Sequence, residues 1–275
     1  MKFAICNETF QGWKIDDVFT YCARIGYDAV EVAPFTLAKY VTDIPAAERA
    51  RIREVATRAG IEISGVHWVL VQAEGMYLTS PDPTTRTRTA SYFCDLVDFC
   101  ADLGGKVIVV GSPKQRSLLP GVSLEQAWDW ATDVFRPSIK AAEQRGVTIC
   151  FEPLPAEDTN FVNTAADAVR FTRQLQSPNF KVILDVRAMS HEALPVADVI
   201  RASKGEFAYV HANDKNLKGP GFGEVDFRPI AAALRDVGYD GTVSVEVFKY
   251  DEGAEVIATK SLAYLKEVFG PGRAS

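Results

Sequence analysis

The sequence has little positive charge and few histidines, and these shortages exclude some classes of protein. It contains three histidines, has a formal net charge of −6 and shows no run of lysine and arginine. A groove for nucleic acid needs a stripe of cations that displaces counterions from the phosphates, so we expect no nucleic-acid partner. No apolar stretch approaches the roughly 18 residues of a membrane span, so we expect no membrane contact either.

The sequence also lacks a disulfide pattern, a leader segment and a linker. Its five cysteines are an odd number, scattered and mostly within apolar segments, which is typical of free thiols in a reducing compartment. The first ten residues, "MKFAICNETF", turn polar after four apolar residues, too soon for a signal-peptide core. Since no tract rich in Pro, Gly or Ser divides the chain, we expect one cytoplasmic domain that spans residues 1–275.

The sequence does contain short apolar runs that alternate with longer amphipathic ones. Continuous apolarity over four to seven residues, rich in Val and Ile, favours parallel strands that are covered on both faces. The eight candidate strands are 3–6, 28–32, 62–68, 106–110, 147–151, 181–184, 207–210 and 242–247.

The segments between these strands have helical periodicity, and four of them end in glycine: 16–26, 45–60, 89–105 and 123–146. Pro137 is expected to kink or break the fourth. Strand–helix pairs repeated over this length predict an α/β protein, a (β/α)8 barrel of the TIM type. The alternative is an open doubly wound sheet, but its glycine-rich phosphate loop is not matched by "CNETFQG" after the first strand.

Four consecutive predicted strands end in residues that carry chemistry. They are Glu152, Asp185, His211 and Glu246, each about one strand–helix unit from the next. In such a barrel these strand ends share one face, which carries the active site. A single carboxylate there is usually a helix cap or an ion-pair partner, but three together repel one another unless a cation holds them. The pattern therefore predicts a bound metal ion.

The donor set indicates which ion to expect. Three carboxylates with one imidazole favour a hard or borderline divalent ion, and the lack of thiolate ligands argues against structural zinc. We therefore expect one divalent metal ion, Mn²⁺ first, with Mg²⁺ and Co²⁺ as alternatives.

The chain resembles the xylose isomerase-like superfamily, in particular the sugar phosphate isomerase/epimerase group that contains the ketose 3-epimerases. The stretch 211–248 carries much of the likeness, through its histidine strand, the glycine-rich loop and the turn "GYDG" before the last glutamate strand. The resemblance implies that Glu152, Asp185, His211 and Glu246 hold the ion. It also implies a homo-oligomer, a dimer or a tetramer, that works in carbohydrate metabolism.

The resemblance further implies a catalytic role for two of these ligands. Glu152 and Glu246 would flank a keto sugar that chelates the ion through its ketone oxygen and a neighbouring hydroxyl. One carboxylate removes the proton next to the carbonyl, and the other returns it to the opposite face of a cis-enediolate. A single base would return the proton to the face that it left.

Two positions depart from the ketose 3-epimerases. Those enzymes have a histidine where Ala188 stands and an arginine where Leu217 stands. The metal site is kept while two sugar contacts are changed. This points away from a free ketohexose and toward a different ring, a glycoside or an acidic sugar.

Several other side chains are candidates for the substrate site. His67, at the end of the third strand, is expected either to contact substrate or to be hydrogen-bonded in the barrel wall. Asp214 is expected to orient His211 or to cap the next turn. Lys114 and Arg116 follow the fourth strand and are expected at the mouth, either gripping an anionic group or solvated. The expected substrate-binding set is His67, Lys114, Asp158 and Arg187.

These residues fit more than one function. The first is a metal-dependent epimerase or isomerase of a keto sugar or its derivative. The second is a lyase or dehydratase that acts by β-elimination on a 3-keto-glycoside or a keto-polyol, with the same metal and base. DNA repair, as in endonuclease IV of the same superfamily, needs many histidines and is disfavoured by three histidines and a net charge of −6. The intact ligand set argues against a non-catalytic barrel.

Overall fold

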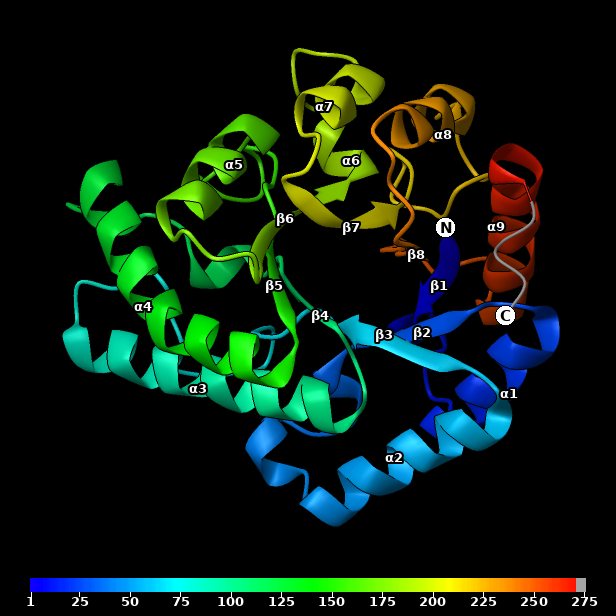
Figure 1. Ribbon diagram of the computed structural model, residues 1–275, viewed down its shortest axis with the longest axis horizontal. Coiled ribbons are helices and arrows are strands. Elements are labelled where there is room, and N and C mark those ends of the chain that lie inside the picture. The colour runs from blue at the N-terminus through cyan, green and yellow to red at the C-terminus, as the bar shows by residue number, and fades with distance from the viewer. Residues whose placement is uncertain (271–275) are drawn as a thin grey trace.

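The computed structural model describes residues 1–270, and this part of the chain forms a closed barrel of eight parallel strands (Figure 1). Neighbours in the barrel are also neighbours in sequence, and β8 closes it by pairing with β1. This confirms the predicted α/β barrel and excludes the open sheet. The strands are β1 (Lys2–Cys6), β2 (Ala29–Val32), β3 (Glu62–Val66), β4 (Val107–Val110), β5 (Thr148–Phe151), β6 (Phe180–Asp185), β7 (Phe207–Ala212) and β8 (Thr242–Val245).

Helices surround the barrel, as Figure 1 shows, and most of them follow a strand. The α-helices are α1 (Ile15–Ile25), α2 (Ala46–Ala59), α3 (Pro83–Asp102), α4 (Leu124–Arg145), α5 (Ala165–Gln174), α6 (Val186–Met189), α7 (Val196–Ala202), α8 (Phe227–Asp236) and α9 (Ala254–Phe269). Short 3-10 turns are η1 (Asn7–Thr9), η2 (Pro34–Thr36), η3 (Val41–Asp43) and η4 (Pro113–Gln115). Helix α3 begins well before residue 89 because the Asp82 carboxylate caps it, accepting from the amides of Thr84 and Thr85.

Pro137 was expected to kink or break the fourth helix, and the break does not occur, since α4 runs without interruption from Leu124 to Arg145. A proline inside a helix removes one backbone hydrogen bond and crowds the preceding turn. Here α4 is held at its start by a capping box of Ser123 and Gln126. It also packs along α3, where the rings of Phe93 and Phe135 lie 4.9 Å apart between centroids. Packing therefore outweighs the local cost of the proline.

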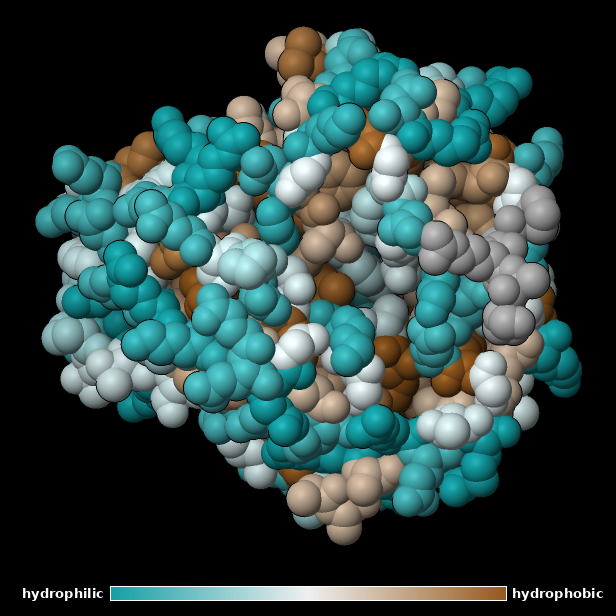
Figure 2. Space-filling view, in the orientation of Figure 1, coloured by the Kyte–Doolittle hydropathy of each residue, from teal (hydrophilic) through white to brown (hydrophobic). Residues whose placement is uncertain are grey.

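Apolar side chains fill the layer between strands and helices. One cluster of phenylalanines joins α4, α5, β5 and β6, with the Phe135, Phe151, Phe171 and Phe180 rings in edge or tilted contact. On the face shown in Figure 2, hydrophilic residues cover most of the rim. Within residues 1–270, no helix combines the length and apolarity that crossing a membrane requires.

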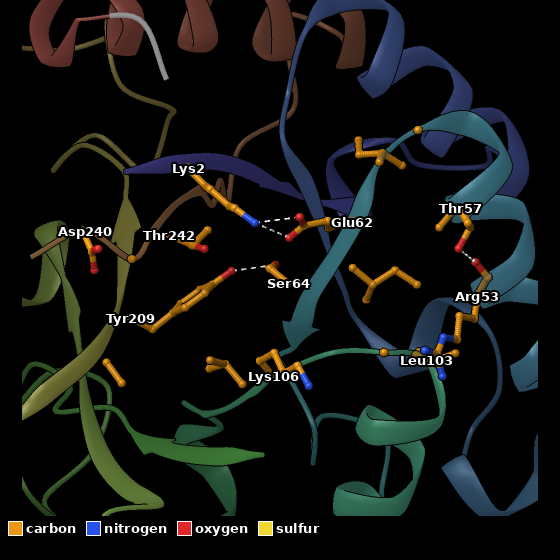
Figure 3. A pocket seen from close by; sticks show the side chains of 18 residues that line it. Lys2, Arg53, Thr57, Glu62, Ser64, Leu103, Lys106, Tyr209, Asp240 and Thr242 are labelled. Carbon is orange, nitrogen blue, oxygen red and sulfur yellow. Dashed lines mark hydrogen bonds and ion pairs between the residues drawn. The ribbon is translucent and has the colours of Figure 1, made fainter. Parts of the chain in front are cut away.

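The amino ends of the strands surround a hollow of about 660 Å³ in which two pairs of polar side chains contact each other (Figure 3). Lys2 Nζ lies 2.6 Å from the Glu62 carboxylate, and Tyr209 Oη is 2.7 Å from Ser64 Oγ. The predicted site residues lie at the other end, where the strands finish. In barrels of this type chemistry belongs to the carboxyl ends, and the amino ends serve stability.

Close contact between β3 and β4 yields a prediction about stability. A Cβ on Gly65 would lie 2.2 Å from the Val107 carbonyl oxygen, so alanine there forces the two strands apart. We expect Gly65→Ala to lower the free energy of unfolding by about 2–4 kcal/mol in thermal or urea denaturation. The control is Gly205→Ala, where the added Cβ meets open space and only the positive φ of +79° costs energy, about 1 kcal/mol. Equal losses in the two variants would contradict this account of the strand contact.

Candidate metal centre and active site

The structure brings the four predicted ligands together at the carboxyl end of the barrel. One ligand atom from each lies within 4.8 Å of the others, and all four side chains are buried. Glu152 directly follows β5, Asp185 ends β6, His211 lies in β7 and Glu246 directly follows β8. The pairing of β6 with β7 places Asp185 opposite His211. The barrel geometry alone therefore gathers residues that are far apart in sequence.

Asp185 is held by donors on both carboxylate oxygens. The amide of Ala188 donates to Oδ1 at 2.7 Å, and the side-chain amide of Asn213 donates to Oδ2 at 2.5 Å. The first bond makes Asp185 the N-cap of the short helix α6. Ala188 thus supports the candidate ligand through its backbone, and its buried side chain is not among those that line the cavity beside the cluster.

His211 is oriented by Glu31, a residue that the sequence did not single out. The His211 Nε2 lies 3.1 Å from Glu31 Oε2, which leaves Nδ1 to face Glu246 Oε2, also at 3.1 Å. Asp214, expected as an alternative partner, instead accepts from the Val225 amide at 2.9 Å and caps the turn. The sequence does contain one signal for Glu31, since it is the single carboxylate within the apolar strand "AVEV".

Two observations indicate that this donor set fits a divalent cation. Although His211 Nδ1 and Glu246 Oε2 lie 3.1 Å apart, both are buried and neither makes a hydrogen bond within residues 1–270. Two ligands that each lie about 2.1 Å from one ion would be separated by about 3 Å. At Gly111 a Cβ would lie 1.8 Å from Glu152 Oε2, so glycine leaves the space that this carboxylate fills.

The electrostatics of the cluster also call for a cation. Burial raises the pKa of Glu152 to about 8, and the charges of Glu246 and Asp185 add to this effect. Burial also raises the pKa of Asp185 to about 6, again with repulsion from Glu246. For Glu246 burial acts in the same direction, but His211 and His67 outweigh it and hold the pKa below its usual range. Burial and mutual repulsion therefore oppose the simultaneous ionisation of these carboxylates, and a cation would offset both effects.

His67 does not contact the cavity, so the expected substrate contact is not found. Its ring is fully buried, with Nε2 at 2.9 Å from Glu8 Oε2 and Nδ1 at 3.4 Å from Glu246 Oε1. The indole nitrogen of Trp68 donates to the same Glu246 oxygen at 2.8 Å. Both ring nitrogens are engaged by carboxylates, so His67 fits the alternative expectation of a hydrogen-bonded wall residue that supports Glu246.

A cavity of about 430 Å³ opens beside the four residues, and the other three predicted substrate contacts line it. Arg187 and Asp158 face each other there, with Nη1 at 2.8 Å from Asp158 Oδ2, and Glu157 takes the second nitrogen at 2.9 Å. The cavity is lined by Trp68, Val71, Val109, Gly111, Ser112, Pro113, Lys114, Gln115, Glu152, Leu154, Asp158, Arg187, Leu217, Glu246 and Phe248.

Arg116 is fully buried rather than at the mouth, which corrects the expectation for this loop. Its guanidinium lies 4.8 Å above the centre of the Phe151 ring, and Nε and Nη2 have no hydrogen-bond partner among the described residues. Burial lowers the pKa of Arg116 to about 10, while attraction to Glu152 and Asp158 opposes that shift. A buried guanidinium therefore offsets part of the negative charge around Glu152.

Comparison with known proteins agrees with the fold. A family model described as xylose isomerase-like TIM barrel matches residues 19–268. The D-psicose 3-epimerase of Ruminiclostridium cellulolyticum is 29% identical over 242 residues, which cover 86% of this chain and 80% of that protein. The 3-dehydro-D-guloside 4-epimerase of Escherichia coli K12 is 25% identical over 272 residues, covering 97% and 99%.

Solved structures share the fold over nearly the whole chain. A D-psicose 3-epimerase with D-tagatose from Clostridium cellulolyticum H10 superposes with a TM-score of 0.85 at 24% identity, covering 98% of this chain and 99% of that one. The 3-keto-D-glucoside 4-epimerase of E. coli superposes with a TM-score of 0.84 at 22% identity, covering 97% and 99%. At these identities the superpositions establish the barrel and nothing finer.

The pairing of His211 with Glu31 predicts an effect on metal affinity. In Glu31→Gln the negative charge that orients and polarises the imidazole is lost, so we expect Mn²⁺ to bind roughly 10-fold or more weakly. Isothermal titration calorimetry on metal-stripped protein measures this. Glu54→Gln, at an exposed position on α2, is the control for the same chemical change. An unchanged Kd for Glu31→Gln, with a normal circular dichroism spectrum, would show that Glu31 does not support the site.

The raised pKa of Glu152 predicts a pH-dependent stability of the metal-free protein. Because the folded-state pKa of about 8 exceeds the usual value of 4.5, folding loses stability as pH rises between these two values. We expect Glu152→Gln to be more stable than the wild type by roughly 2–4 kcal/mol at pH 8.5, and by much less at pH 5. Thermal denaturation in EDTA measures the difference. With saturating Mn²⁺ the order should reverse, and a pH-independent difference would contradict the assignment.

Proposed function

The chain belongs to the xylose isomerase-like TIM-barrel family, and we propose that it is a divalent-metal-dependent epimerase or isomerase of a keto sugar or a sugar derivative. The observation that carries the proposal is that Glu152 and Glu246, which follow different strands, belong to one buried cluster and line one cavity. The similarity to proteins named D-psicose 3-epimerase and 3-dehydro-D-guloside 4-epimerase supports it.

Glu152, Asp185, His211 and Glu246 would hold the ion, and Mn²⁺ suits this donor set best. When bound, the ion polarises the substrate ketone and acidifies the adjacent C–H. Asp185 is fixed by Ala188 and Asn213, so it serves to bind and not to move protons.

Glu152 and Glu246 carry the proton transfer in this proposal. Each offers a carboxylate to the cavity from its own strand, and β6 and β7 lie between those strands. A proton removed by one carboxylate and returned by the other reaches the opposite face of a flat enediolate, which inverts the carbon. Trp68 and His67 hold one oxygen of Glu246, so this carboxylate keeps its orientation through the reaction. The buried wall around both excludes bulk water and protects the enediolate from stray protonation.

The cysteines support the setting that we propose, the cytoplasm. All five are free, and four of them are buried, as expected for a protein that folds in a reducing compartment. We also propose, from the family resemblance, a homo-oligomer that acts on a small carbohydrate, with no nucleic-acid partner.

The test of the function is hydrogen exchange at the carbon next to the ketone. Metal-stripped protein reloaded with Mn²⁺ is incubated in D₂O with a panel of ketoses and 3-keto-glycosides and followed by ¹H NMR. We expect a new diastereomer that carries deuterium, formed by the wild type and lost by at least 100-fold in Glu246→Gln. Release of an aglycone or loss of water instead would identify the lyase alternative. Exchange with no dependence on either glutamate would overturn the proposal.

A further inference from the structure

One side of the cavity is an apolar surface, which we call the aglycone wall and define as Trp68, Val71, Leu217 and Phe248. Its members come from three separate regions of the chain and contact one another. The rings of Trp68 and Phe248 lie 6.0 Å apart between centroids, and the carbonyl of Leu217 accepts from the Phe248 amide at 2.9 Å. The wall is therefore one continuous surface built across the loops that follow β3, β7 and β8.

Two members of the wall adopt strained backbone conformations. Trp68 has a φ of 53° and Leu217 a φ of 72°, in the left-handed region that side chains with a Cβ disfavour. Such conformations persist only where the surroundings fix them, and they concentrate at functional sites. At Leu217 the surroundings are clear: its amide donates to the Asp214 carbonyl, and its carbonyl accepts from both Phe248 and Lys249. Both side chains line the cavity despite the energetic cost of their backbone conformations.

The wall extends from the reacting centre to solvent. At its inner end the Trp68 indole donates to Glu246, one of the four candidate ligands. At its outer end Val71 is 41% exposed, and its amide bonds to the Trp68 carbonyl at 3.3 Å. A substrate whose ketone reaches the glutamates would lay its far end, and not its reacting end, along this surface.

The cavity is larger than a free keto sugar requires. The about 12 non-hydrogen atoms of a ketohexose need less than roughly 360 Å³, because a bonded atom takes less room than the roughly 30 Å³ of a liquid water molecule. The cavity holds about 430 Å³, so space remains beyond a hexose ring. A sugar hydroxyl that faces these four apolar side chains loses its hydrogen bonds to water, whereas Ser112, Gln115 and Asp158 offer polar contacts elsewhere in the cavity.

Arg187, one of two cations that line the cavity, is not free to bind an acidic sugar, and the other, Lys114, is exposed on η4. Arg187 already contacts Asp158 and Glu157 at 2.8 and 2.9 Å, so its charge is taken up within the protein. Its guanidinium also lies 5.8 Å from the centre of the Phe248 ring. Arg187 thus packs against the aglycone wall and is not free to bind an anion.

From these observations, and resting on the proposed function, we infer that the substrate is a keto-glycoside with an uncharged apolar aglycone that packs on the aglycone wall. Trp68, Val71, Leu217 and Phe248 then select for the aglycone, while the glutamates act on the sugar. The glycosidic bond stays intact, and epimerisation occurs at the carbon beside the ketone. An aromatic aglycone suits the flat faces of Trp68 and Phe248 best.

The kinetic test compares two substrates that differ only in the aglycone. Phenyl and methyl 3-keto-β-D-glucosides are followed in D₂O with the Mn²⁺-loaded enzyme. We expect the phenyl compound to have a KM roughly 10–100-fold lower, with a similar kcat, because its ring is bound equally in the ground and transition states. In Leu217→Ala and Val71→Ala this KM ratio should fall by roughly 3- to 10-fold. Val256→Ala, also an exposed valine but on α9, is the control and should leave the ratio unchanged.

A binding measurement gives a readout that does not need turnover. Phenyl and methyl β-D-glucoside carry no ketone and do not react, so quenching of Trp68 fluorescence reports their binding to the same protein. We expect the phenyl glucoside to bind at least 10-fold more tightly, and Trp68→Phe to lose the quench while it keeps the preference.

The outcomes separate this inference from the proposed function. Exchange on both keto-glucosides with equal KM values, together with equal binding of the two glucosides, keeps the epimerase and overturns the aglycone wall. Preferred binding of the phenyl glucoside without exchange on either keto-glucoside supports the wall and overturns the proposed function. Preferential use of a glucuronide or of a free ketose over the phenyl compound also overturns the inference.

Discussion

Repulsion between buried carboxylates is the constraint that organises this barrel. Glu8, Glu31, Glu152, Asp185 and Glu246 all lie buried toward one end of it. Like charges in a low-dielectric interior are tolerated only with compensating charge close by. The fold provides part of this compensating positive charge, because an imidazole or a guanidinium lies beside several of the carboxylates. The remaining deficit is what a divalent ion would fill.

The two histidines show how this compensation is distributed. His67 lies between Glu8 and Glu246, and His211 lies between Glu31 and Glu246. Burial opposes the charge on His67, but Glu8 and Glu31 outweigh it and raise its pKa to about 10. For His211 the proton and a metal ion are alternatives, since either satisfies Glu246 and only neutral imidazole can be a ligand. Binding of a divalent ion would thus displace this proton and add a net charge of +1 to the cluster.

The sequence predicted the features that local patterns determine. It did not predict the roles of residues that depend on contacts across the barrel. The strand order and the four residues at strand ends followed from apolar runs and from spacing. Glu31 and Arg116 take their roles from residues more than 30 positions away that the closed sheet brings beside them. His67 was predicted to contact substrate because it follows a strand end. Its position in the sequence does not show that both ring nitrogens face buried carboxylates instead. The break expected as one outcome at Pro137 does not occur, because packing of α4 against α3 outweighs the local preference of proline.

The tie between Leu217 and the strand end of β8 has a consequence for how selection reaches the chemistry. The Leu217 carbonyl holds the amides of Phe248 and Lys249, and Glu246 stands two residues before Phe248 on the same short segment. A ligand that displaced Leu217 would therefore disturb the backbone that carries Glu246, one of the two carboxylates proposed to transfer the proton. Under the proposed function, a substrate that fits poorly beside Leu217 would misalign Glu246 and lose turnover even after it has bound.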